Sequence, residues 1–115
     1  MSLNTATEAI EGGQLLRVLG RLDSSTAPVL EKALLGLLEQ DGARVLVDFA
    51  ALGYVSSAGL RVVLMAAKQA RLVKGRLVLC ELQPHVADVF EMSGFTRILE
   101  IAESEAAGRA RLVAP

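Results

Sequence analysis

The sequence has 115 residues, enough for one hydrophobic core, and 52% of them are hydrophobic, which excludes an intrinsically disordered chain. Its 12 basic and 13 acidic residues give a net charge of −1 without a basic patch, so we expect no nucleic-acid partner. No apolar run is long enough to span a bilayer and the N-terminal stretch does not read as a secretory signal, so we expect a cytoplasmic protein without membrane insertion.

The chain is predicted to open with a β-hairpin followed by a helix. Strands are expected around residues 6–10 and over residues 15–19, with a turn at Gly12-Gly13 between them and Gly20 ending the second strand. The hydroxyl-rich residues 23–26 are expected to cap the helix, which Asp41-Gly42 ends. The core-facing stripe of this helix has the spacing of an amphipathic helix and consists of Leu30, Ala33, Leu34, Leu37 and Leu38.

The centre of the chain is predicted to be a buried strand, a short loop and a second helix. Residues 45–49 are apolar on both faces, as in a strand covered on each side, and residues 50–52 with Gly53 are expected to lead out of it. The helix then begins beside Ser56 and Ser57. Its predicted core stripe is Leu60, Val63, Leu64 and Ala67.

Two serines at the start of a helix have two interpretations that spacing alone leaves open. Either hydroxyl can cap the helix by accepting a hydrogen bond from a backbone N–H group. The positive end of a helix dipole also tolerates a phosphate, which brings about −1.5 to −2 charges and three acceptor oxygens. Ser56 and Ser57 are therefore either helix caps or part of a phosphorylation switch.

The last third of the chain is predicted to continue the alternation of strands and helices. We expect a strand over residues 76–80, a helix from Pro84 to Ser93-Gly94, a strand over residues 98–101 and a terminal helix. The full order, β-β-α-β-α-β-α-β-α, predicts an α/β fold with a mixed four- to five-stranded sheet and about four helices. In this sheet an antiparallel opening hairpin is followed by parallel β-α units.

The residues give little support for catalysis or metal binding. His85 is the single histidine and lacks neighbouring ligands, and Cys80 sits inside a predicted strand, as a buried small hydrophobe does. No P-loop or dinucleotide fingerprint is present, and Ser56-Ser57-Ala58-Gly59 is not a nucleophile elbow. We therefore expect no enzyme activity, no metal and no cofactor.

Three segments together resemble the STAS domain, specifically the bacterial anti-sigma factor antagonist family. They are GRLDSSTA at residues 20–27, VDF at residues 47–49 with YVSSAGL at residues 54–60, and FEMSGF at residues 90–95. Their order extends the similarity over about residues 6–110, so that residues 1–115 are expected to form a single STAS domain.

The resemblance implies a regulator that acts by exchanging partners. In this family the unphosphorylated antagonist binds an anti-sigma factor, a GHKL-type serine kinase, and so frees a sigma factor. The kinase then phosphorylates one serine, which ends the complex, and a serine phosphatase reverses the step. Aligning Gly59-Leu60 with the family's Gly-Leu places the phosphoacceptor at Ser57, whereas Ser56 occupies the usual Asp position and is the alternative acceptor.

A partner-binding surface is predicted around this serine. The family's first loop maps to Asp23, Ser24 and Ser25, which the resemblance places beside the phosphoserine. On the second helix Arg61, Met65 and Lys68 share a face, at i, i+4 and i+7, that differs from the core stripe. The predicted surface comprises Asp23, Ser24, Ser25, Ser56, Ser57, Ala58, Gly59, Arg61, Met65 and Lys68.

Other roles remain open at this point. The same fold could serve as an accessory subunit of a lipid-transport ATPase or as a scaffold subunit of a stress-sensing complex. The residues Arg61 and Lys68 can also be read as ordinary solvated charges, with Met65 at the edge of the core. Self-association is possible as well.

Overall fold

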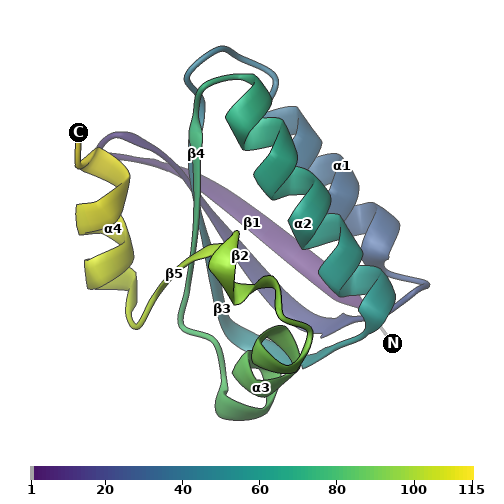
Figure 1. The fold of residues 1–115 in the computed structure, drawn as a ribbon. Helices are drawn as coiled ribbons and strands as arrows, with labels where there is room; N and C mark the ends of the chain where they lie inside the picture. The colour runs from purple at the N-terminus through teal and green to yellow at the C-terminus, as the bar shows by residue number, and fades with distance from the viewer. Residues whose placement is uncertain (1) are drawn as a thin grey trace.

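A computed structural model describes residues 2–115 and contains the predicted order of strands and helices (Figure 1). Five strands and four α-helices alternate as expected, with one additional 3-10 turn, η1, before the last strand. The strands are β1 Leu3–Ile10, β2 Gly13–Leu22, β3 Arg44–Val55, β4 Arg76–Cys80 and β5 Glu100–Ala102. The helices are α1 Ala27–Leu37, α2 Ser57–Leu72, α3 Pro84–Met92, η1 Phe95–Arg97 and α4 Glu105–Val113.

The strands form one mixed sheet in the order β1-β2-β3-β4-β5. Strands β1 and β2 pair antiparallel, and every later pair is parallel, as the sequence predicted. Because β2, β3 and β4 run in the same direction, the loops that follow them lie at the same edge of the sheet. Residues Leu22 and Val55, the last of β2 and β3, are paired directly, which brings the next two loops together.

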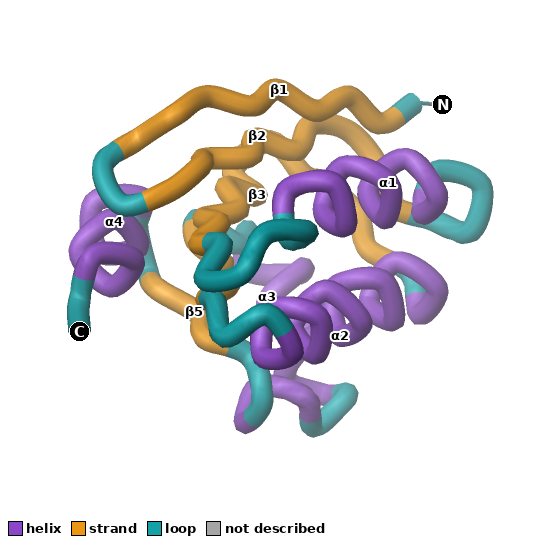
Figure 2. The backbone as a smooth tube through the Cα atoms, turned by 90° about the horizontal axis from the view of Figure 1, so that it is seen from above, coloured by secondary structure: helices purple, strands orange, loops and turns teal. Residues whose placement is uncertain are grey.

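Helices cover both faces of the sheet, and each face has its own apolar cluster. Helices α1, α2 and α3 lie on one face, and α4 lies alone on the other (Figures 1 and 2). Phe49 and Phe90 are fully buried on the three-helix side, with ring centroids 6.4 Å apart. The smaller cluster beneath α4 is Leu15, Leu46, Val78, Cys80, Ala102 and Leu112. Among residues 2–115, no helix is both long and apolar enough to cross a membrane.

Two predicted strand ends were wrong, and both strands are longer than expected. Strand β2 continues past Gly20 to Leu22, and β3 includes residues 50–55, which were expected to form a loop. The pairing of these two strands shifts register twice, so bulges let them continue past the glycine. Gly20 has φ +115° and packs against the Ser2 carbonyl, where a side chain would not fit.

Smaller differences affect other boundaries. Strand β1 begins at Leu3 rather than near residue 6. Strand β5 is Glu100–Ala102 rather than residues 98–101, and the 3-10 turn η1 precedes it at residues 95–97. Helix α1 ends at Leu37, before the predicted stop at residues 41–42. The buried stripe of α2 is also wider than predicted, because Val62, Ala66 and Ala70 are buried too. None of these differences moves the two loops that carry the predicted site.

Candidate phosphorylation and partner-binding site

The two serines at the start of α2 have different roles. Ser56 has an extended backbone, and its Oγ accepts a hydrogen bond from the Gly59 N–H group at 3.2 Å, so Ser56 is the helix cap. Ser57 is the first residue of the helix and is exposed. In the part of the chain that the structure describes, no hydrogen bond engages the Ser57 hydroxyl. One serine is therefore used by the fold and the other is free.

The loop between β2 and α1 is organised by the Asp23 carboxylate. Its Oδ1 accepts hydrogen bonds from the Ser25 N–H at 3.0 Å, the Ser25 hydroxyl at 2.7 Å and the Thr26 N–H at 3.1 Å. These bonds, chiefly the one from the Ser25 hydroxyl, lower the pKa of Asp23 from its ordinary value. Of residues 23–26, which were expected to cap α1, Thr26 takes the N-cap position, but its hydroxyl makes no capping bond and donates to the Arg21 carbonyl at 2.8 Å.

The two loops meet through backbone contacts. The Ser56 N–H donates to the Leu22 carbonyl at 2.8 Å, so the residue before Asp23 is joined to the residue before Ser57. Gly59 packs against the same residue: a Cβ there would lie 2.8 Å from Leu22 Cδ2 and 3.1 Å from its carbonyl oxygen. The structure therefore brings the predicted Asp23 loop beside the predicted phosphoacceptor.

Along α2, the three predicted surface residues are placed differently. Arg61 and Lys68 are exposed, and Met65 is half-buried. No side-chain hydrogen bond or ion pair among residues 2–115 involves Arg61 or Lys68. Ala58 is half-buried and Ser24 is exposed. The predicted residues therefore form a surface that begins at the two loops and continues along α2.

A stacked pair next to this surface was not predicted from the sequence. Arg21 Cζ lies 4.1 Å from the centre of the Tyr54 ring, a cation–π geometry, and these residues pair across β2 and β3. Each lies two residues before a site residue, Asp23 and Ser56. The pair joins the ends of β2 and β3 that precede the two loops. The segments that hold Arg21 and Tyr54 were recognised, but their contact depends on pairing between distant strands.

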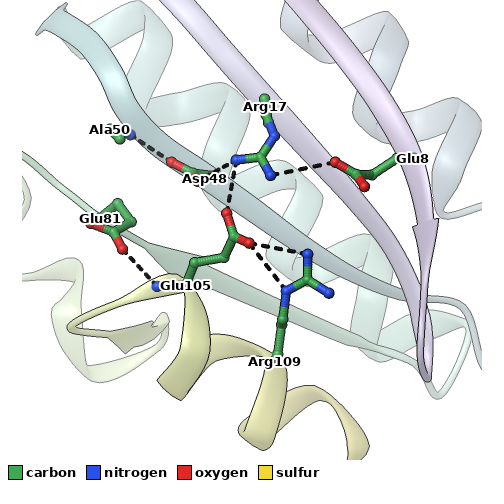
Figure 3. A network of polar contacts seen from close by, with 7 residues as sticks. All are labelled: Glu8, Arg17, Asp48, Ala50, Glu81, Glu105 and Arg109. Atoms are coloured by element: carbon green, nitrogen blue, oxygen red, sulfur yellow. Dashed lines mark hydrogen bonds and ion pairs between the residues drawn. The ribbon is translucent and has the colours of Figure 1, made fainter.

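A polar network on the other face ties α4 to the sheet (Figure 3). Arg17 Nη1 donates to Asp48 Oδ2 at 2.9 Å and to Glu105 Oε1 at 2.8 Å, and its Nη2 reaches Glu8 Oε1 at 3.4 Å. Glu81 Oε2 accepts the Glu105 N–H at 2.7 Å, at the start of α4. One guanidinium thus joins β1, β2, β3 and α4.

Two carboxyl groups in this network share the same guanidinium nitrogen. Burial, together with the neighbouring Glu105, raises the pKa of Asp48. Hydrogen bonding from Asp48 and Arg17 lowers the pKa of Glu105. When the pair holds one proton, that proton therefore resides on Asp48, the more buried of the two.

We expect Asp48→Asn to leave the free energy of unfolding at pH 7 within about 1 kcal/mol of wild type, although it removes an ion pair with half-exposed Arg17. Because folding raises the pKa of Asp48, ionising it opposes folding, and this penalty disappears as pH falls. Wild type should therefore gain stability relative to Asp48→Asn between pH 7 and pH 4. Urea unfolding at four pH values measures this difference; a constant difference would contradict the assignment.

The contacts of His85 and the burial of Cys80 are those of residues that support the fold. The exposed His85 ring places Nε2 2.6 Å from the Gly53 carbonyl oxygen, which ties α3 to β3. Cys80 is fully buried, and burial raises the pKa of its thiol to about 12, so the reactive thiolate is disfavoured. Within residues 2–115, no three His, Cys, Asp or Glu side chains are gathered as metal ligands would be.

Comparison with known proteins agrees with the fold and with the family resemblance. The STAS domain model matches residues 4–108. BtrV of Bordetella bronchiseptica, named as an anti-sigma factor antagonist, is 47% identical over 103 residues, which is 90% of this chain and 89% of BtrV. The anti-sigma-B factor antagonist of Listeria monocytogenes is 33% identical over 88 residues, covering 76% of this chain and 77% of the relative.

The solved structure of an anti-sigma factor antagonist from Mycobacterium paratuberculosis has the same fold. Its TM-score is 0.88 at 18% identity, with 97% of this chain and 95% of that chain covered. The chain therefore belongs to the STAS domain family. Its group within that family is the anti-sigma factor antagonists, as the sequence segments around Asp23 and Ser57 suggested.

Proposed function

We propose that this chain, with residues 1–115 forming a single STAS domain, controls sigma-factor availability through phosphorylation of Ser57. In its unphosphorylated form it binds an anti-sigma factor that is a GHKL-type serine kinase, which frees the sigma factor. Phosphorylation ends this complex, and a serine phosphatase restores the binding form. The chain acts in the cytoplasm as a regulator and has no catalytic activity of its own.

The different positions of the two serines carry this proposal. The Ser57 hydroxyl is exposed and is not engaged by the fold, so a kinase can reach it without breaking an internal contact. The Ser56 hydroxyl caps α2 through the Gly59 N–H, and a phosphate on it would disturb that bond. This difference favours Ser57 over Ser56 as the phosphoacceptor.

The electrostatic surroundings of Ser57 suit a reversible switch. The N-terminus of α2 tolerates a phosphate, because its free N–H groups and the helix dipole favour negative charge. The Asp23 carboxylate in the adjoining loop keeps its charge, since its hydrogen bonds lower its pKa. A phosphate therefore adds about −1.5 to −2 charges beside Asp23 while the domain stays folded, and a partner that fits the neutral hydroxyl is repelled.

The partner-binding surface follows from the same geometry. It consists of Asp23, Ser24, Ser25, Ser56, Ser57, Ala58, Gly59, Arg61, Met65 and Lys68. The two loops form one end of it, and the exposed charges of α2 continue it along the helix. A kinase bound here contacts the serine that it modifies, so binding and release depend on the same residue.

Phosphopeptide mapping tests the identity of the acceptor. The full chain and its variants Ser57→Ala and Ser56→Ala are incubated with ATP and each GHKL-type kinase of the host, and intact masses and peptides are measured. We expect one phosphate on Ser57 in wild type, none in Ser57→Ala, and one on Ser57 in Ser56→Ala. Phosphate on Ser56 in wild type would move the site by one residue, and no phosphate with any kinase would overturn the switch.

A further inference from the structure

An open groove of about 680 Å³ lies at the end of α2 opposite the switch site. Its walls are the last turns of α2, the start of β4, residues 96–101 and Arg111 of α4. Arg71, in the last turn of α2, lies fourteen residues beyond Ser57, which is about 21 Å along a helix. The groove therefore lies about 21 Å from the switch serine and begins where the partner surface along α2 ends, at Lys68.

The charged side chains that line this groove are mostly positive. They are Arg71, Arg76, Arg97, Arg111 and Glu100. Four positive charges and one negative charge leave the lining at +3, whereas the whole chain carries −1. The negative end of the α2 dipole offsets only about half a charge here. The groove thus concentrates positive charge on a chain that is slightly acidic overall.

Two of the arginines are already used by the fold in part. Arg76 Nε donates to Glu100 Oε1 at 3.1 Å, and its Nη1 donates to the Arg111 and Ala114 carbonyls at 2.6 and 3.1 Å. Arg111 Nη1 lies 3.9 Å from Glu100 Oε2. In contrast, Arg71 and Arg97 are exposed, and no side-chain hydrogen bond or ion pair within residues 2–115 involves them. These two guanidinium groups are available to a ligand.

The rest of the lining indicates what kind of anion fits. Apart from Gly75 and Thr96 it is aliphatic, and Ile98, with 40% of its surface exposed, presents an apolar side chain next to Arg97. No aromatic side chain lines the groove, so it lacks the stacking platform that nucleotide bases use. A lining that combines arginines with aliphatic side chains complements carboxylates and aliphatic side chains on a peptide.

We propose that this groove binds an acidic, partly aliphatic segment of a partner protein, with carboxylates on Arg71 and Arg97 and an apolar side chain on Ile98. It is a second interaction surface, beyond the one proposed for the kinase. Because it lies at the other end of α2, its occupation does not require the Ser57 hydroxyl. One domain can therefore stay attached to one protein while it exchanges another.

The test is an NMR titration of the 15N-labelled full chain with a decapeptide that alternates Glu and Val. We expect amide shifts in residues 96–101 and the last turn of α2, none in residues 23–26, and weaker binding as salt increases. The double variant Arg71→Gln/Arg97→Gln should lose about tenfold or more in affinity. The control variant is Lys32→Glu on α1, which changes the net charge of the chain by −2, as the double variant does. It should bind the peptide as wild type does.

Three results would overturn this inference. The first is an equal loss of affinity in Lys32→Glu, which would mean that only net charge matters. The second is peptide-induced shifts outside the groove, or no shifts at all. The third is binding of ATP or oligouridylate in the groove by a protein that does not bind the peptide. None of these results depends on whether Ser57 is phosphorylated.

Discussion

Replacing Ser57 by Asp is expected to weaken binding to the anti-sigma factor kinase by about 100-fold, equivalent to about 3 kcal/mol. The carboxylate adds a charge next to Asp23, at a position where the unphosphorylated protein presents a neutral hydroxyl. Ser57→Ala should bind at least as tightly as wild type and stay bound in the presence of ATP. Titration calorimetry of the three proteins against the same kinase measures the effect.

Differences in kinase affinity among these three proteins can be assigned to Ser57 itself, because its hydroxyl has no role in the fold that the substitutions would remove. The helix cap belongs to Ser56, so Ser57→Ala loses no capping hydrogen bond and should unfold at the wild-type temperature within about 2 °C. Ser56→Ala is the matched control for stability, since it removes the capping hydrogen bond and should cost about 1 kcal/mol, whereas Ser57→Ala should not. Equal affinities for wild type, Ser57→Ala and Ser57→Asp would show that Ser57 is not part of the interface.

Replacing Gly59 by Ala is expected to destabilise the domain by about 1–3 kcal/mol. The added Cβ would meet the buried Leu22 side chain and carbonyl, and that carbonyl accepts the Ser56 N–H bond that joins the two loops. The start of α2 must therefore move away from β2. Thermal unfolding followed by circular dichroism measures the change, and kinase binding should weaken in the same variant.

Gly36 supplies the matched control for this prediction. It lies near the end of α1, and no atom lies within 4 Å of the position that a Cβ would take. Gly36→Ala should therefore stabilise the domain by about 0.5–1 kcal/mol, the ordinary gain for alanine in a helix. If Gly59→Ala were as stabilising as Gly36→Ala, the close packing between α2 and β2 would be refuted.

The order of the strands and helices could be predicted because it depends on local signals. Apolar runs, helical spacing and the turn residues each act within a few positions of the chain. The ends of β2 and β3 could not be predicted, because they depend on pairing between the two strands. Gly20 is an ordinary stop signal in isolation. Here the parallel pairing of β2 with β3 continues past it along the chain, as far as Leu22 and Val55.

The candidate site could be predicted only in part. The segments around Asp23 and Ser57 were found from their resemblance to a family, whereas spacing alone did not distinguish the cap from the free serine. That distinction requires the position of the Gly59 N–H group relative to Ser56. The network of Arg17 with Asp48 and Glu105 was missed, because these contacts span 31 and 88 residues and no local pattern records them.

The central claim is that a phosphate on Ser57 ends binding to the anti-sigma factor kinase. The most direct measurement compares the affinity of that kinase for the wild-type chain before and after enzymatic phosphorylation, with the phosphorylated protein purified and its site verified. We predict a loss of about 100-fold, restored by treatment with a serine phosphatase. Equal affinity of the two forms would contradict the account, because the exposed Ser57 would then be modified without any effect on its partner.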